Sequence, residues 1–264
     1  MRRDKRAEGL SPEMLVFQRK TCYTKLIKLL WFFPAFCLPG KGRKGTMLGY
    51  LHNFMRQFDV SMLLQLLERT MAVLLCLTVH ETCHGLAAWL LGDPTAKRMN
   101  RLSLNPFHHI DWLGLASMFL CGFGWAKAVP VDMRHFRNPR AGMALTALAG
   151  PVSNFLLALL LIFSAIQMPE RFLGSGFGLW LFSFLLSTAA LSIGLGLFNL
   201  LPIPPLDGSK ILFSALPERA YYTLMRYERF GMLLLLAIVW LDLGGSYLSN
   251  GIQAVYIWMV ELFI

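Results

Sequence analysis

Residues 71–91, MAVLLCLTVHETCHGLAAWLL, are an apolar stretch with ionisable side chains at its centre. The stretch is long enough and apolar enough to cross a lipid bilayer as a helix. Yet it contains His80, Glu81 and His84, and ionisable groups are costly inside a membrane and rarely occur there without a function. The combination predicts a spanning helix that carries a polar site.

His80, Glu81 and His84 form the pattern H-E-x-x-H. Residues four positions apart lie on one face of a helix, one turn from each other. Two imidazoles at this spacing can bind one zinc ion, and the adjacent glutamate can take a proton from water. An amphipathic helix with a polar stripe is the alternative, but the surrounding apolar residues leave no solvated face for it. The zinc interpretation requires a third ligand from elsewhere in the chain.

The composition is that of a membrane protein rather than of a soluble domain. Of the 264 residues, 56% are hydrophobic and 15% are charged, and the mean hydropathy is +0.52. We therefore expect an all-α, polytopic transmembrane helical bundle. The net charge of +10 is typical of Lys and Arg in cytoplasmic loops. Because these charges are divided among short loops and the N-terminal segment, we expect no nucleic-acid partner.

The chain divides into two predicted parts. Residues 1–60 are interpreted as a basic N-terminal extension outside the native fold, with Met47 and Met55 as plausible translation starts. Its apolar run contains Pro34 and is too short to cross a bilayer. Residues 61–264 are the predicted membrane-embedded domain.

Four spans are expected in this domain. They cover about residues 70–91, 143–167, 177–201 and 231–243, with an amphipathic interfacial helix before the fourth and a tail, 247–264, that packs on the bundle or crosses again. The glycine-rich stretch 112–126 lies between two basic loops, so both of its ends are expected in the cytoplasm. We interpret it as a short re-entrant hairpin or a broken helix.

Asp207 is the best candidate for the third metal ligand. It follows the third span in NLLPIPPLDG, where Pro202, Pro204 and Pro205 exclude a regular helix. Two histidines and one carboxylate leave a fourth position open, which is typical of catalytic rather than structural zinc. Considered alone, this loop would favour Asp207 as a turn residue or a helix N-cap.

Several motifs together resemble the site-2 protease family of intramembrane zinc metalloproteases, in its compact bacterial branch. They are HETCH, GWAKAVPV, AGPVSN and NLLPIPPLDG, in this order, with GDPTAKR…RLSLNP between the first two. The resemblance implies one Zn²⁺ per chain, held by His80, His84 and Asp207, with Glu81 as the catalytic base. It also implies that Asn154 helps to hold substrate or the oxyanion, although a helix–helix hydrogen bond is an alternative role. Ala128 stands where the family commonly has proline.

The function implied by this resemblance is hydrolysis of peptide bonds in or near transmembrane segments of membrane proteins. The expected surroundings are a bacterial cytoplasmic membrane and its lipid bilayer, with the active site near the cytoplasmic face and the 112–126 stretch binding the unwound substrate. A transporter or ion pathway, and an inactive membrane scaffold, are the competing functions. Three loop histidines, His108, His109 and His135, are expected to be solvated rather than metal-binding.

Overall fold

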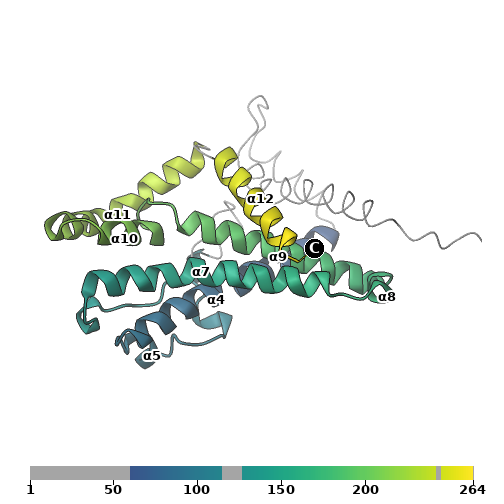
Figure 1. The fold of residues 1–264 in the computed structure, drawn as a ribbon, viewed down its shortest axis with the longest axis horizontal. Coiled ribbons are helices and arrows are strands. Elements are labelled where there is room, and N and C mark those ends of the chain that lie inside the picture. Colours follow the sequence, from purple (N-terminus) through teal and green to yellow (C-terminus); the bar gives the residue numbers. More distant parts are fainter. Residues whose placement is uncertain (1–59, 115–126, 242–244, 264) are drawn as a thin grey trace, which may run out of the picture. The chain divides into compact units, whose positions relative to one another are not determined.

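A computed structural model describes residues 60–114, 127–241 and 245–263. Regular structure in these ranges is helical, which confirms the predicted all-α class (Figure 1). The helices are α4 (Val60–Leu90), α5 (Thr95–Arg98), α7 (Pro139–Ile166), α8 (Glu170–Leu173), α9 (Gly176–Asn199), α10 (Asp207–Ser214), α11 (Glu218–Trp240) and α12 (Gly245–Glu261), with short 3-10 turns η1 (Pro106–His108) and η2 (Met133–His135).

Three of the described helices are long and apolar enough to cross a membrane: α4 over Leu63–Leu90, α7 and α9. They correspond to the first three predicted spans. Helix α4, as described from Val60 to Leu90, includes residues before the expected start of the span, among them Glu68 and Arg69. Long charged side chains near a helix end can extend to the headgroup region, so they do not terminate the helix there.

The fourth predicted span is part of a longer helix. The expected interfacial helix and the span at 231–243 form one continuous α11 as far as Trp240. Among the described residues, α11 is not one of the helices that qualify as membrane spans, because its charged first half leaves too short an apolar run. The tail forms α12, which packs against α9. Packing on the bundle was one of the two alternatives predicted for this segment.

Helix α7 is the central element of the described bundle. It packs against α4, α9 and α10, and Figure 1 shows it running alongside α9. Small side chains are buried along these contacts, among them Ala147, Ala158, Ala189 and Ala190. Small residues allow membrane helices to approach closely, and the dispersion contacts that result are a main source of their association.

Caps and prolines set the ends of the helices around the site. Asn138 caps α7 through its side chain and Pro139 follows at the first position, an arrangement that favours helix initiation. Helix α9 starts at the Ser175 cap and ends at Asn199, before the first proline of the loop that leads to α10.

The start of α10 lies against the end of α9. A Cβ on Gly208 would come within 2.2 Å of the Leu200 carbonyl oxygen, so any larger residue would push the two backbones apart. Asp207 occupies the first turn of α10. The proline-rich loop and Gly208 therefore fix the position of this carboxylate.

Two sequence predictions concern segments that lie largely outside the described residues. The re-entrant segment 112–126 lies outside the described residues except for 112–114, and the N-terminal extension 1–60 lies outside them except for Val60.

Candidate metal centre

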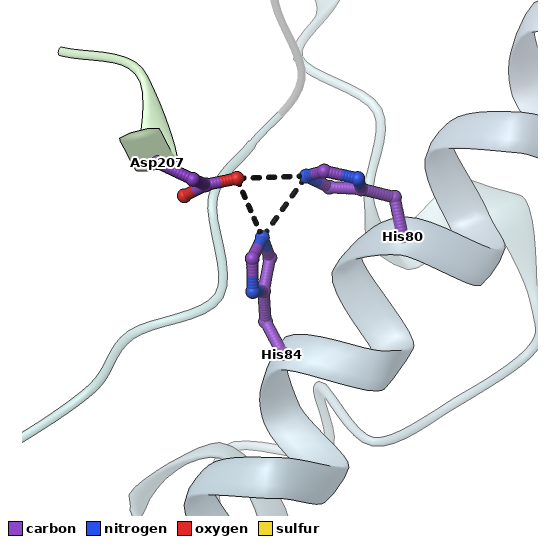
Figure 2. Close-up of side chains that lie close together, drawn as sticks. All are labelled: His80, His84 and Asp207. Atoms are coloured by element: carbon purple, nitrogen blue, oxygen red, sulfur yellow. Dashed lines mark hydrogen bonds and ion pairs between the residues drawn. The ribbon is translucent and has the colours of Figure 1, made fainter. Parts of the chain in front are cut away.

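His80, His84 and Asp207 come together in the described structure, as the sequence predicts (Figure 2). The Nε2 atoms of the two histidines are 2.9 Å apart. The Oδ2 atom of Asp207 lies 3.2 Å from Nε2 of His80 and 3.1 Å from Nε2 of His84. All three residues are buried. Residues from α4 and from α10, more than a hundred positions apart, thus direct three ligand atoms at one point.

The separations fit a tetrahedral zinc site. With zinc–ligand bonds of 2.0–2.1 Å, neighbouring ligand atoms lie about 3.3 Å apart. The observed separations, 2.9–3.2 Å, are close to this value. Two imidazoles and one carboxylate are also a donor set that zinc accepts readily.

A hydrogen bond to the backbone determines the tautomer of His84. Its Nδ1 atom lies 2.7 Å from the backbone carbonyl oxygen of Thr146. A carbonyl only accepts, so Nδ1 carries the proton and donates it. In the neutral ring, Nε2 then presents its lone pair to the cluster, which is the tautomer that a metal ligand requires.

His80 contacts a side chain of α7. Its Nδ1 atom lies 3.0 Å from the carboxamide nitrogen of Asn154. Asn154 is completely buried, and Ser192 of α9 donates a hydrogen bond to its backbone carbonyl. The alternative role considered for Asn154, a helix–helix hydrogen bond, is the contact observed between α7 and α4.

The Asp207 carboxyl lies among positively polarised groups. Burial by itself would raise its pKa, but hydrogen bonds donated by the protonated imidazoles of His80 and His84, and the ammonium charge of Lys210, hold the pKa well below its ordinary value. A metal ion bound here takes the place of the protons that the two imidazoles direct at the carboxylate. The Nζ atom of Lys210 is 3.8 Å from Oδ1, the oxygen that faces away from the histidines. Asp207 is therefore ionised at neutral pH, the form that binds a metal ion.

Helix α7 passes directly behind the two imidazoles. A Cβ on Gly150 would lie 2.4 Å from Nε2 of His84 and 2.6 Å from Cε1 of His80. Thr146, Gly150 and Asn154 are spaced four residues apart and so share one face of α7. The helix continues unbroken through Pro151, so the glycine allows α7 to pack closely against the two histidines without any unwinding of the helix.

Glu81 is held by a backbone group. The Val129 N–H donates to its Oε2 atom at 3.0 Å, and the residue is 9% exposed. The segment around Val129 is itself held at two other points: Lys127 N–H donates to the His109 carbonyl, and Asp132 N–H donates to Asp93 at 2.7 Å. Glu81 therefore contacts a segment that is itself held at Lys127 and at Asp132.

Of the three loop histidines, His109 differs from the prediction. It is 3% exposed, with Nε2 2.8 Å from the Ser103 carbonyl oxygen, so the expectation of a solvated side chain is wrong. The loop folds back on α4, which the sequence pattern did not reveal. His108 is exposed, and His135 pairs with Asp93 at 3.2 Å.

Two contacts of the site could not be found from residue types. Thr146 and Val129 contribute backbone atoms, and a backbone carbonyl or N–H leaves no signature in the side chain. Gly150 and Asn154 did stand out, in the AGPVSN motif, but their contacts with the histidines depend on the packing of α7 against α4.

Comparisons with known proteins agree on one family. The model of peptidase family M50 matches residues 177–241. The chain is 37% identical over 169 residues to "Putative zinc metalloprotease YwhC" of Bacillus subtilis, an alignment that covers 63% of this chain and 77% of the relative. It is 30% identical over 173 residues to the Rip2 protein of Mycolicibacterium smegmatis, whose name carries the same description.

The alignments with the mycobacterial relatives cover a smaller share of those proteins than the alignment with the Bacillus protein does. The alignment with the Mycolicibacterium protein spans 63% of this chain and 64% of that protein, and the one with Rip2 of Mycobacterium tuberculosis, at 31% identity over 170 residues, spans 62% and 63%. No solved structure matches the chain. The names of these relatives imply zinc, for which His80, His84 and Asp207 form the candidate site.

Proposed function

The chain belongs to peptidase family M50, the site-2 protease family, and from this premise we propose that it is a zinc metalloendopeptidase that cuts membrane proteins in or near their transmembrane segments. The observation that carries the proposal is the buried cluster of His80, His84 and Asp207. Its two histidines, and Glu81 next to His80, lie on α4, a helix apolar enough to span a membrane. Such a cluster is costly in a membrane unless it has a function.

In this proposal His80, His84 and Asp207 hold the metal, and Glu81 moves the proton. A bound zinc ion supplies Lewis acidity, lowering the pKa of a water molecule and polarising the scissile carbonyl. The Val129 N–H orients the Glu81 carboxylate through Oε2. Glu81 takes a proton from the attacking water and returns it to the leaving amine.

We place the site toward the cytoplasmic face. His84 precedes the end of α4 by six residues, about 9 Å along a helix. The loop that follows α4 carries Lys97, Arg98 and Arg101, and the one before α7 carries Arg134 and Arg137. Basic loops stay in the cytoplasm, and water reaches a site near that surface by a short path. The bacterial cytoplasmic membrane is the corresponding location.

The proposal is tested by comparing membrane proteins in cells that express the wild-type chain or Glu81→Gln. Glutamine keeps the size of the side chain but cannot act as a base. We expect new protein termini within or near transmembrane segments in the wild-type cells and their loss with Glu81→Gln, since removal of a general base lowers rates by roughly 10²–10⁴-fold.

Zinc content of both proteins is the control, because the variant keeps all three metal ligands. Identical membrane-protein termini in the two strains, with zinc bound in both, would contradict proteolysis and favour the scaffold. A change in ion flux without any change in termini would favour the ion pathway.

A further inference from the structure

We propose that Asn154 is a positioning residue for the metal ligand His80, and that its side-chain oxygen accepts the proton on Nδ1 of that imidazole. The inference rests on the assignment of His80 as a zinc ligand, and it does not depend on proteolytic activity. It assigns the asparagine of the AGPVSN motif to the metal site itself.

The contact geometry supports this role. The carboxamide of Asn154 lies 3.0 Å from Nδ1 of His80, while Nε2 of the same ring faces Asp207 at 3.2 Å. A ring that binds metal through Nε2 keeps its proton on Nδ1, and that proton needs an acceptor. Within the described part of the chain, the Asn154 side chain is the group placed to provide one.

The orientation of the carboxamide follows from the same requirement. With the nitrogen of Asn154 toward His80, two donors face each other, and the Oδ1 atom is buried without a hydrogen-bond partner among the described residues. Oxygen and nitrogen of a carboxamide are nearly identical in shape, and the hydrogen-bond network decides between them. Rotation by 180° places Oδ1 against Nδ1 and satisfies the histidine.

The second histidine shows the same arrangement with a different acceptor. Nδ1 of His84 donates to the Thr146 carbonyl oxygen at 2.7 Å, eight residues before Asn154 on the same face of α7. One helix thus supplies an acceptor behind each imidazole. The acceptor for His80 is a side chain, so it can be changed without altering the backbone.

Burial favours positioning over direct contact with a substrate. Asn154 has 0% of its surface exposed, and α9 covers it through Ser192, whose hydroxyl donates to the Asn154 carbonyl at 2.8 Å. A side chain enclosed in this way can act on the reaction through His80 without reaching the substrate.

The test measures zinc affinity of the full chain in detergent, by competition with a chromogenic chelator, for the wild type and three variants. Asn154→Ala removes the acceptor and should weaken zinc binding by about 10–100-fold, the usual effect of losing a partner of a metal-bound histidine. Asn154→Asp keeps an acceptor and should bind zinc at least as tightly as the wild type. Ser153→Ala is the matched control, because among the described residues its hydroxyl donates to the Gly150 carbonyl of the same helix.

Two results would overturn the proposal: zinc affinity of Asn154→Ala within threefold of the wild type, or an affinity of Asn154→Asp as weak as that of Asn154→Ala. Elution volume and thermal unfolding establish that each variant is folded. If Asn154→Ala does not fold, Asn154→Leu, which has the same branching at Cγ as asparagine but no hydrogen-bonding atoms, replaces it in the comparison with Asn154→Asp.

Discussion

Gly150 lies so close to His84 that a Cβ on the glycine would be 2.4 Å from the Nε2 atom of the imidazole. That nitrogen is one of the three candidate ligand atoms. The backbone of α7 therefore forms the wall behind the site, and it can approach this closely only because residue 150 has no side chain. The metal centre depends on a helix that contributes no ligand to it.

Gly150→Ala should abolish stoichiometric zinc binding while the protein still folds. The methyl group would overlap the imidazole of His84 and displace it, and a displacement of this size separates the three ligand atoms. Elsewhere in a helix the same change is stabilising by about 1 kcal/mol. Metal analysis of the purified variant checks the prediction.

Gly251→Ala in α12 is the matched control for this substitution. A Cβ there meets its nearest neighbour, Leu197, at 3.8 Å, an ordinary van der Waals contact. We expect its zinc content to equal that of the wild type. Full zinc occupancy in Gly150→Ala would show that α7 can move away from His84 and that zinc binding does not require the close packing.

Val129→Pro should reduce turnover without loss of zinc. Proline has no backbone N–H, so the bond to Oε2 of Glu81 is lost and the carboxylate is no longer oriented. Val129→Ala keeps the N–H and is the control. We expect turnover of the proline variant to fall at least tenfold below that of the alanine variant, with equal zinc content. Equal turnover would show that Glu81 needs no help from this backbone group.

Asp93→Asn should lower the stability of the folded protein at neutral pH. Asp93 is fully buried and accepts hydrogen bonds from the backbone N–H groups of Thr95 and Asp132. Asparagine offers one acceptor atom in place of two. Leaving a buried N–H unpaired costs about 1–3 kcal/mol of unfolding free energy, which thermal unfolding in mild detergent can detect.

The pH dependence of this effect has a defined sign. Burial would raise the pKa of Asp93, but the hydrogen bonds from Thr95 and Asp132 and the nearby His135 lower it below the ordinary 3.8. A carboxyl whose pKa is lowered by folding stabilises the fold above its unfolded pKa, and the contribution disappears as pH falls through the folded pKa. The difference between wild type and Asp93→Asn should therefore be full at pH 7 and shrink below pH 3.8.

Glu170→Gln, a change of a carboxylate in the first turn of α8, is the control for the pH series and should match the wild type throughout. A difference between wild type and Asp93→Asn that stays the same at pH 7 and at pH 3 would contradict the assigned role of the Asp93 carboxylate.

The sequence predicted the parts of the site that depend on residue type. H-E-x-x-H on an apolar helix identified His80, Glu81 and His84, and the prolines before Asp207 identified a fixed loop with a carboxylate. The structure places the two histidines and Asp207 together. The three spanning helices were also predictable, because continuous apolar runs of this length are typical of membrane-spanning helices.

What the sequence could not supply depends on tertiary packing. The acceptor of His84 is the Thr146 carbonyl and the donor to Glu81 is the Val129 N–H, and every residue except proline offers both groups. His109 looks like a solvated loop residue until the loop folds onto α4 and buries it. The merging of two predicted elements into α11 depends on helix continuity across Phe230 and Gly231, where no proline marks a boundary.

The most direct test of the central claim is the metal content of the purified chain, measured for wild type, His80→Ala and Asp207→Ala. The account predicts about one zinc ion per wild-type chain and its loss in both variants, because the α4 histidines and the α10 carboxylate hold the same ion. Retention of zinc in Asp207→Ala would show that the third ligand lies elsewhere, and absence of zinc from a folded, zinc-reloaded wild type would contradict the metalloprotease account altogether.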